Sequence, residues 1–303
     1  MLNPLRKLKA LLQNVITIRT AELYERERWY YMEIFKTHYT RYKRWIEPKG
    51  GSTLAIDVII PVIEKDLAVL PQVINGIRQH VKHPLKSIYI VAPANAAIIA
   101  CAEANNAVFV DEKRVCDISK QQINYVVNGI NRSGWLYQQF LKLNFDKVST
   151  TENYLVVDAD TVFIKNIQFE GKGLFYFDFS DEYHLPYYKA YEILTGLKHR
   201  VEVSFVAHYM FFSKVKLAEL KAQIGKHTGT KTENAIIGLV DVIKDLSNFS
   251  EYETYANYCI HTQPEKYRLR YWFNKTCPSK DLAEIEKLKK DKTYKSISFH
   301  AYN

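Results

Sequence analysis

The chain has 303 residues, of which 47% are hydrophobic and 14% aromatic, and its formal net charge is +9. This length and apolar content suit one large domain with an appendage, and they exclude a disordered or fibrous protein. The four cysteines form no C-x-x-C pair, which excludes a zinc-finger module. Because neither a secretory signal nor a bilayer-spanning apolar run is evident, we expect a cytoplasmic protein.

Residues 1–50 are the most basic part of the chain, with eleven Lys or Arg against five Asp or Glu. Leu5, Leu8 and Leu12 recur at helical spacing among basic residues, which predicts a basic amphipathic helix. Such a helix packs on its own domain or a sister subunit, which would make a homo-oligomer, or lies on the inner face of the membrane. Aromatic and basic residues alternate between Trp29 and Trp45, but no nucleic-acid motif accompanies them, so we expect no nucleic-acid partner.

The breaker Glu-Pro-Lys-Gly-Gly-Ser at residues 47–52 separates this extension, residues 1–50, from a second domain, residues 51–303. Strands and helices then alternate. Strands are expected at residues 55–62, 87–91 and 107–110, and helices at 71–80 and 94–105. This order predicts an α/β fold with a mostly parallel central sheet flanked by helices, in which ligands bind beyond the carboxyl ends of the strands.

The second half of the chain has a more mixed pattern. Residues 121–145 are expected to be helical, and residues 154–157 form another buried strand. Further strands are expected at 174–179, 204–212 and 296–299, and helices near 215–223, 231–245 and 251–259. The first half therefore has the pattern of a nucleotide-binding sheet, and the second half that of an acceptor-binding region.

Asp158 and Asp160 follow the apolar strand Tyr-Leu-Val-Val directly. On an extended backbone, side chains two residues apart leave on the same side, so both carboxylates can meet one cation. A hard divalent ion held there can bridge the phosphates of a diphosphate and neutralise the charge of a leaving group. A D-x-D triplet also occurs by chance in surface turns, but here apolar segments flank it on both sides, which favours a metal site.

Three blocks carry a family resemblance: Ile-Asp-Val-Ile-Ile-Pro at 56–61, Gly-Trp-Leu-Tyr-Gln-Gln-Phe-Leu-Lys-Leu at 134–143, and Tyr-Leu-Val-Val-Asp-Ala-Asp-Thr at 154–161. With further blocks at 179–184, 204–210 and 249–258, the chain resembles the bacterial GT-A-fold glycosyltransferases, and more narrowly the DUF6492-type family. The resemblance covers about residues 55–300.

The resemblance implies a GT-A-like fold and transfer of a sugar from a nucleotide-diphosphate sugar, with Mn²⁺ or Mg²⁺ as cofactor. The acceptor it implies is a glycan or lipid-linked glycan of bacterial cell-surface polysaccharide synthesis. It also implies that the first loop and the 134–143 helix contact the donor, and that a C-terminal histidine completes the metal site. On this chain those residues are Pro61, Val62, Lys65, Asp66, Trp135, Gln138, Gln139, Lys142 and His300. Trp135 is the candidate wall of the sugar pocket, although a core position for it is the stronger interpretation.

Glu251 and Glu253 lie among tyrosines at an expected helix start and are the candidates for catalysis. A carboxylate that accepts the proton of a sugar hydroxyl makes that oxygen a better nucleophile. Glu251 is preferred as the base, which favours inversion of the anomeric carbon, while retention without a base stays open. Ser250 as a helix cap explains one of these glutamates by local structure alone. Further candidates for acceptor or substrate contacts are Asp178, Asp181, His184 and His208.

Two other functions remain open from the sequence. A sugar nucleotidyltransferase also uses a parallel sheet and paired carboxylates, but no glycine-rich phosphate loop follows the first strand. A peripheral membrane or nucleic-acid binding protein would act through residues 1–50 and would leave Asp158 and Asp160 without a role.

Overall fold

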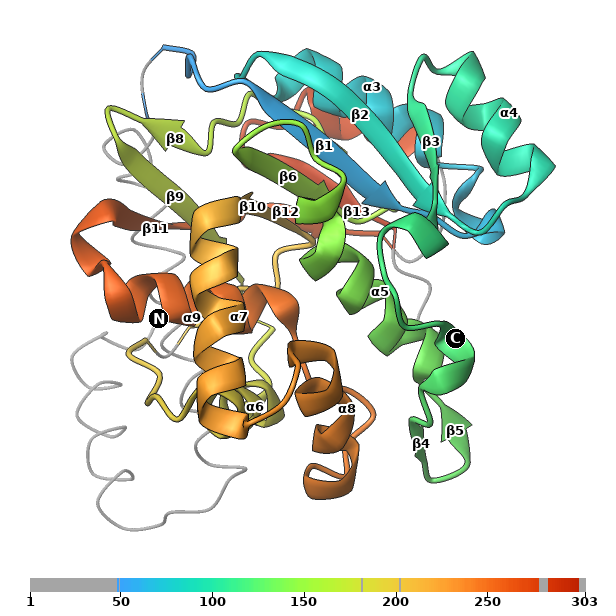
Figure 1. Cartoon of the computed structure of the whole chain (residues 1–303). Coiled ribbons are helices and arrows are strands. Elements are labelled where there is room, and N and C mark those ends of the chain that lie inside the picture. Colours follow the sequence, from blue (N-terminus) through green and yellow to red (C-terminus); the bar gives the residue numbers. More distant parts are fainter. Residues whose placement is uncertain (1–47, 49, 181, 202, 278–282, 300–303) are drawn as a thin grey trace, which may run out of the picture. The chain divides into compact units, whose positions relative to one another are not determined.

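The computed structural model describes residues 48, 50–180, 182–201, 203–277 and 283–299. A five-stranded sheet in the order β10-β6-β1-β2-β3 forms its centre (Figure 1). Its strands are β1 Ile56–Pro61, β2 Leu85–Ala92, β3 Val108–Asp111, β6 Asn153–Val157 and β10 Tyr209–Ser213. All except β10 run parallel to their neighbours, and β10 is antiparallel to β6. The expected α/β class, with a mostly parallel central sheet and flanking helices, is confirmed.

The described helices surround this sheet. They are α3 Leu70–His80, α4 Ala96–Ala104, α5 Ser133–Asn144, α6 Leu185–Thr195, α7 Lys214–Thr228, α8 Thr232–Val242, α9 Glu251–Thr262 and α10 Ala283–Lys289. Helices α6 to α9 gather on one side of the sheet, in the lower half of Figure 1. Local sequence explains several starts: Pro71 lies in the first turn of α3, and Asn95 caps α4 by accepting from the backbone N–H of Ala97 at 2.9 Å.

Two three-stranded sheets, whose strands all follow Asp158 in the sequence, extend the fold. One has the order β11-β9-β8, with β11 Tyr267–Tyr271, β9 Leu174–Phe179 and β8 Glu170–Gly171. The other has the order β12-β13-β7, with β12 Asn274–Thr276, β13 Ser296–Ser298 and β7 Thr161–Phe163. Because β7 begins one residue after Asp160 and pairs with β13, the described C-terminal end of the chain lies beside the D-x-D triplet.

The expectation of helix throughout residues 121–145 is wrong for its first half. A two-stranded hairpin, β4 Val126–Val127 and β5 Ile130–Asn131, occupies that stretch, and α5 begins at Ser133. The turn consists of Asn128 and Gly129, with φ of 51° and 78°. An Asn-Gly pair takes two positive φ angles at little cost, which favours a tight hairpin over a continuous helix.

The many aromatic residues mainly fill the core. Tyr154 of β6 stacks on Phe212 of β10 with ring centroids 5.4 Å apart, and Phe163 meets Tyr209 edge to face at 4.9 Å. These rings are fully or almost fully buried. Their burial rather than a ring-lined cleft therefore accounts for much of the aromatic content.

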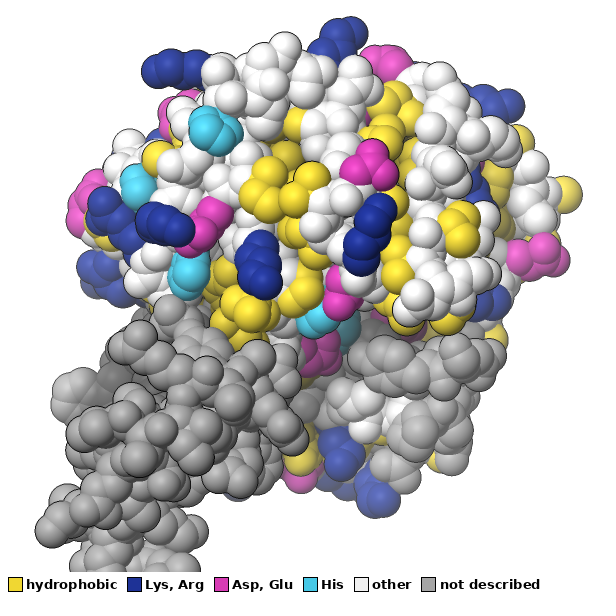
Figure 2. All heavy atoms as spheres, turned by 90° about the horizontal axis from the view of Figure 1, so that it is seen from below, with side chains coloured by type: hydrophobic (Ala, Val, Ile, Leu, Met, Phe, Trp, Pro, Cys, Tyr) yellow, Lys and Arg dark blue, Asp and Glu magenta, His cyan; other side chains and the backbone are white. Residues whose placement is uncertain are grey.

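Part of the sequence interpretation lies outside the described residues. The predicted amphipathic helix falls there, and the boundary near residue 50 stays a prediction. On the face shown in Figure 2, described Lys and Arg side chains are interspersed with Asp and Glu. None of the described helices combines the length and the apolar character needed to cross a bilayer.

Candidate functional site

Asp158 and His208 meet at the carboxyl edge of the central sheet. The parallel strands β1 and β6 end there, and the antiparallel strand β10 starts there, so residues beyond Val157 and before Tyr209 become neighbours. The backbone N–H of Asp158 donates to the carbonyl of His208 at 2.9 Å. Strand 204–212 was expected to be continuous, but β10 begins at Tyr209 because His208 has a φ of 61°. Such a conformation is costly for a non-glycine residue and is often found at functional sites.

The Asp158 carboxylate is the centre of a network from three further elements. Its Oδ1 lies 2.7 Å from the Lys142 ammonium of α5 and accepts from the Tyr252 hydroxyl of α9 at 3.1 Å. Its Oδ2 lies 3.4 Å from His208 Nδ1, and the other ring nitrogen of His208 lies 3.5 Å from Glu182. The Lys142 ammonium also lies 2.8 Å from Glu251 Oε1 and 4.4 Å from the centre of the Tyr252 ring. We call Lys142, Asp158, His208 and Glu251 the charged cluster.

Lys142, Asp158 and His208 are each held in the charged form by the opposite charges around them. Burial by itself would lower the pKa of Lys142, but the carboxylates of Asp158 and Glu251 raise it above its usual value. Burial would also raise the pKa of Asp158, but Lys142 and His208 hold it well below its usual range. For His208, burial is likewise outweighed by Asp158 and Glu182, which raise its pKa to about 9. Lys142 and His208 are therefore cations, and Asp158 is an anion, at neutral pH.

The donor set at this edge fits a hard divalent cation. Asp158 and Asp160 are partly exposed, and each has carboxylate oxygens. The triplet is not on the extended backbone that was expected: it lies in a turn in which the N–H of Thr161 donates to the carbonyl of Asp158 at 3.0 Å. Within the described residues, no group of three or more acidic, His or Cys side chains is placed to hold a metal. Mg²⁺ commonly takes only one or two carboxylates and completes its shell with substrate phosphates and water, so the pair suffices. The backbone N–H of Phe299 donates to the carbonyl of Asp160 at 3.0 Å. His300, the predicted third ligand, lies outside the described residues.

Glu251 and Glu253 have different surroundings although both are buried in the first turn of α9. Glu251 faces Lys142, and burial raises its pKa, while Lys142 opposes the shift. Glu253 accepts from the backbone N–H of Phe205 at 2.8 Å and from Asn257 at 3.2 Å. The Ser250 hydroxyl caps the helix by accepting from the Glu253 N–H at 3.2 Å, as expected. Glu251 is thus part of the charged cluster, whereas Glu253 holds the backbone at Phe205, three residues before His208.

The predicted nucleotide-binding loop lies at the same edge of the sheet. Pro61 ends β1 next to the end of β6. Val62 is buried, and its backbone N–H donates a hydrogen bond to the carbonyl of Val91 at 2.9 Å. Lys65 is exposed in a short 3-10 helix, Glu64–Asp66, and the Asp66 carboxylate accepts from the Ile63 N–H at 3.1 Å. The structure therefore brings the loop to the edge that bears Asp158.

Helix α5 presents its predicted residues in different ways. Lys142 is buried and joins the charged cluster. Gln139 is also buried, and its side-chain amide donates to the carbonyl of Trp135 at 3.0 Å, while Gln138 is half-buried. The Trp135 ring is half-buried, 4.8 Å from the Arg132 guanidinium and edge to face with Tyr125. Of the α5 residues predicted for the donor, Lys142 is the one that contacts Asp158.

Two of the remaining predicted residues form ion pairs with residues outside the charged cluster. Asp178 in β9 forms a two-pronged ion pair with the fully buried Arg270 of β11, at 2.9 and 2.7 Å. His184 precedes α6 and lies 2.9 Å from Asp245. Asp181 lies outside the described residues. Of the residues predicted for the acceptor or substrate, His208 is the one that the structure brings into the charged cluster.

Sequence reasoning missed three residues of this site. Tyr252 stands between the two predicted glutamates, and Glu182 stands between Asp181 and Tyr183 in a block that was singled out. The Glu182 side chain is 33% exposed, against 2% for Glu251, so it is the more accessible of the two glutamates. Trp272, directly after β11, packs its ring 5.3 Å from that of His208. Tyr252 and Glu182 could have been found because predicted residues stand next to them in the sequence. No local sequence pattern pointed to Trp272.

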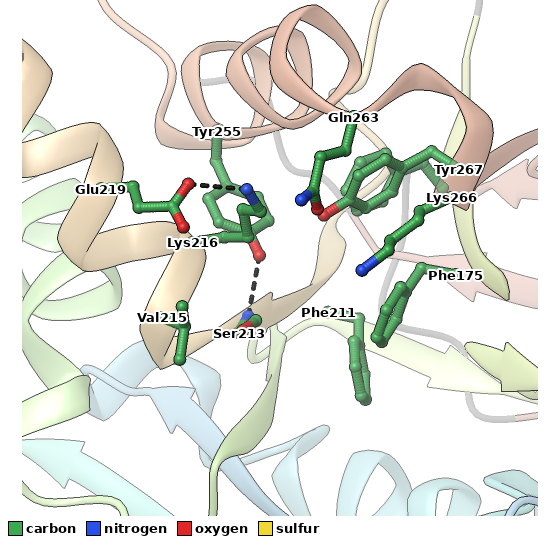
Figure 3. Close-up of a pocket in the computed structure, with 11 residues that line it drawn as sticks. Phe175, Phe211, Ser213, Val215, Lys216, Glu219, Tyr255, Gln263, Lys266 and Tyr267 are labelled. Atoms are coloured by element: carbon green, nitrogen blue, oxygen red, sulfur yellow. Dashed lines mark hydrogen bonds and ion pairs between the residues drawn. The ribbon is translucent and has the colours of Figure 1, made fainter. Parts of the chain in front are cut away.

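A separate hollow of about 270 Å³ lies toward the opposite end of β10. Phe175, Phe211 and Tyr267 line it, and Ser213, which ends β10, lies at its base (Figure 3). The Lys216 ammonium pairs with Glu219 at 2.6 Å there, as Figure 3 shows. Since Ser213 and Tyr209 stand at opposite ends of β10, this hollow is distinct from the charged cluster.

Residues 54–303 match the model of DUF6492, a family of unknown function. The chain belongs to this family. No curated protein matches the sequence. One similar solved structure is the galactosyltransferase LgtC in complex with donor and acceptor sugar analogues, with a TM-score of 0.42 and 9% identity over 80% of this chain and 87% of that one. Another is glucosyl-3-phosphoglycerate synthase from Mycobacterium tuberculosis with Mn²⁺, uridine diphosphate and glucosyl-3-phosphoglycerate, with a TM-score of 0.32 and 14% identity over 57% and 63% of the chains. The DUF6492 match covers the whole charged cluster.

Proposed function

We propose that this DUF6492 protein is a metal-dependent glycosyltransferase that uses a nucleoside-diphosphate sugar as donor. One observation carries the proposal: Asp158 and Asp160 stand at the carboxyl edge of the parallel sheet, and Asp158 is held there by Lys142, Tyr252 and His208. Ligands of open parallel sheets bind at this edge. A pair of carboxylates at such an edge suits a cation that is shared with a diphosphate.

In this proposal the chain's own residues position the donor. Pro61 and Val62 line the nucleotide side of the edge, next to the end of β6. Asp158 and Asp160 would hold Mn²⁺ or Mg²⁺, which would neutralise charge on the departing diphosphate. Tyr252 and Lys142 fix the orientation of the Asp158 carboxylate before any ligand arrives, so little reorganisation is needed on binding.

Glu251 is the proposed base, and His208 with Glu182 is proposed to face the acceptor. The raised pKa of Glu251 makes its carboxylate a stronger proton acceptor than an ordinary glutamate. A base acting on the acceptor hydroxyl would invert the anomeric configuration. The proposed acceptor is a glycan or lipid-linked glycan, as the sequence resemblance implies, and the basic residues 1–50 are proposed to contact a membrane or a second copy of the chain.

The test is a panel of nucleoside-diphosphate sugars, assayed with and without Mn²⁺ for thermal stabilisation and for donor turnover. With one donor class at roughly 100 times its Kd, we expect a Tm rise of about 5 °C that requires Mn²⁺. Asp160→Asn is expected to lose this rise and to lower turnover by about 100-fold or more, because one of the two cation ligands is gone.

Asp241→Asn is the matched control, because the Asp241 side chain is 90% exposed on α8. It should behave like the wild type in both assays. A Tm rise that is the same with and without Mn²⁺, and the same in Asp160→Asn, would contradict the proposed function.

A further inference from the structure

The Lys142 ammonium is buried and is surrounded by three neighbouring side chains in this structure. Its ammonium lies 2.7 Å from Asp158, 2.8 Å from Glu251 and over the ring of Tyr252, and the side chain is 3% exposed. Both carboxylates are within ion-pair distance of this one ammonium. Because the ammonium is buried, a donor phosphate could reach it only if these side chains moved.

The two carboxylates that Lys142 joins come from different parts of the fold. Asp158 follows β6, while Glu251 opens α9, and α5 brings Lys142 between them. Without this cation, two buried or partly buried carboxylates would face each other. Unpaired buried charge is strongly unfavourable, so Lys142 sets the spacing of both groups.

Lys142 also lowers the affinity of Asp158 for a metal cation. Oδ1 of Asp158 already faces the Lys142 ammonium and accepts from Tyr252, while Oδ2 lies 3.4 Å from His208 Nδ1. A fixed positive charge at this distance repels an incoming divalent ion. The affinity of the site for metal is therefore held down before the donor arrives with its own negative charge.

We propose that Lys142 is a positioning residue and an internal countercharge: it holds Asp158 and Glu251 in one geometry and weakens metal binding in the absence of donor. This inference rests on the proposed function, and it departs from the expectation that Lys142 contacts the donor directly. Metal would then bind tightly only together with a diphosphate, whose negative charge offsets the ammonium.

The experiment measures Mn²⁺ binding to the donor-free full chain by calorimetry for the wild type and Lys142→Met. We expect the Kd for Mn²⁺ to fall by about tenfold or more in Lys142→Met, because a like charge next to the ligand is removed. A merely structural role predicts the opposite, since a disordered site would bind Mn²⁺ more weakly. An unchanged or weakened affinity would overturn the inference.

Lys147→Met is the matched control, because Lys147 follows α5 in the short 3-10 helix Phe145–Lys147 and pairs with the exposed Asp117. Its affinity for Mn²⁺ should equal that of the wild type. If Lys142→Met fails to fold, the double variant Lys142→Met with Glu251→Gln removes one carboxylate as well and is used in its place. This double variant is expected to show the same fall in the Kd for Mn²⁺. An unchanged or higher Kd would count equally against the inference.

A second readout separates this inference from the proposed function. With an active donor at saturating Mn²⁺, Lys142→Met should lower kcat by about 100-fold while the donor KM stays within about threefold. A selective rise in KM would instead make Lys142 a donor ligand. Since calorimetry with Mn²⁺ alone requires no donor, failure to find an active donor would bear on the proposed function and leave the binding result to decide the inference.

Discussion

At the scale of single residues, the site depends on a few side chains that neutralise one another. Lys142 and His208 carry positive charge close to the carboxylate of Asp158, and Tyr252 donates to the same group. His208 has a positive φ of 61°, a backbone conformation that is unfavourable for a non-glycine residue. A residue held in this conformation between two carboxylates indicates that its position matters for function.

The two glutamates of α9 should differ sharply when they are replaced. Glu251→Gln is expected to lower kcat by a factor of about 10² to 10⁴, as the loss of a general base does, and to lower the unfolding free energy because it breaks the buried ion pair with Lys142. Glu253→Gln should chiefly destabilise the fold, by about 1.5–3 kcal/mol, because its carboxylate accepts from the Phe205 N–H and from Asn257. Steady-state kinetics and urea unfolding measure the two effects.

Each variant serves as the control for the other, since both change one buried glutamate in the same helical turn. If Glu253→Gln lost turnover while remaining as stable as the wild type, Glu253 would be the better base. If neither variant altered kcat, the accessible Glu182 would become the carboxylate to test next.

At the scale of secondary-structure elements, the contact between α3 and β7 places the strand that follows Asp160. Gly76 of α3 lies so close to β7 that an added Cβ would stand 2.7 Å from the carbonyl oxygen of Phe163 and 3.1 Å from its nitrogen. Both are backbone atoms and cannot rotate away. The absence of a side chain at Gly76 is therefore what lets the helix approach this strand.

Gly76→Ala is expected to destabilise the fold by about 1–3 kcal/mol, because the helix must move away from β7. Gly238→Ala in α8 is the matched control, since, apart from its chain neighbours and the nearby backbone of its own helix, no described heavy atom lies within 4 Å of its added Cβ. Alanine favours helix, so that variant should be neutral or more stable by up to about 1 kcal/mol. Urea unfolding of both variants measures this, and equal stability of the two would contradict the packing argument.

The elements that could be predicted were those with a strong local pattern. The apolar runs that became β1 and β6, and the helix that follows Pro71, lie close to the expected positions. Helix α6 was not predicted, because its sequence Leu-Pro-Tyr-Tyr-Lys-Ala-Tyr-Glu-Ile-Leu-Thr mixes rings and polar groups without a narrow apolar stripe. The hairpin before α5 depends on the Asn-Gly turn at residues 128 and 129, a two-residue signal within a longer stretch that was expected to be helical.

At the scale of the whole molecule, the site is assembled from distant parts of the chain. Tyr252 and Asp158 are 94 residues apart in sequence, yet they share a hydrogen bond. Sequence reasoning could place Asp158 at a strand end, because that depends on local pattern. It could not find the pairing of Lys142 with both Asp158 and Glu251, since that depends on how α5, β6 and α9 pack together.

The central claim is that Asp158 and Asp160 hold a divalent cation against the diphosphate of a nucleotide. The most direct test is the anomalous scattering of Mn²⁺ in crystals of the full chain grown with Mn²⁺ and the nucleoside diphosphate of the preferred donor. We predict an anomalous peak within about 2.5 Å of oxygens from both the carboxylate pair and the diphosphate. A diphosphate bound elsewhere, or a peak remote from both aspartates, would contradict the account.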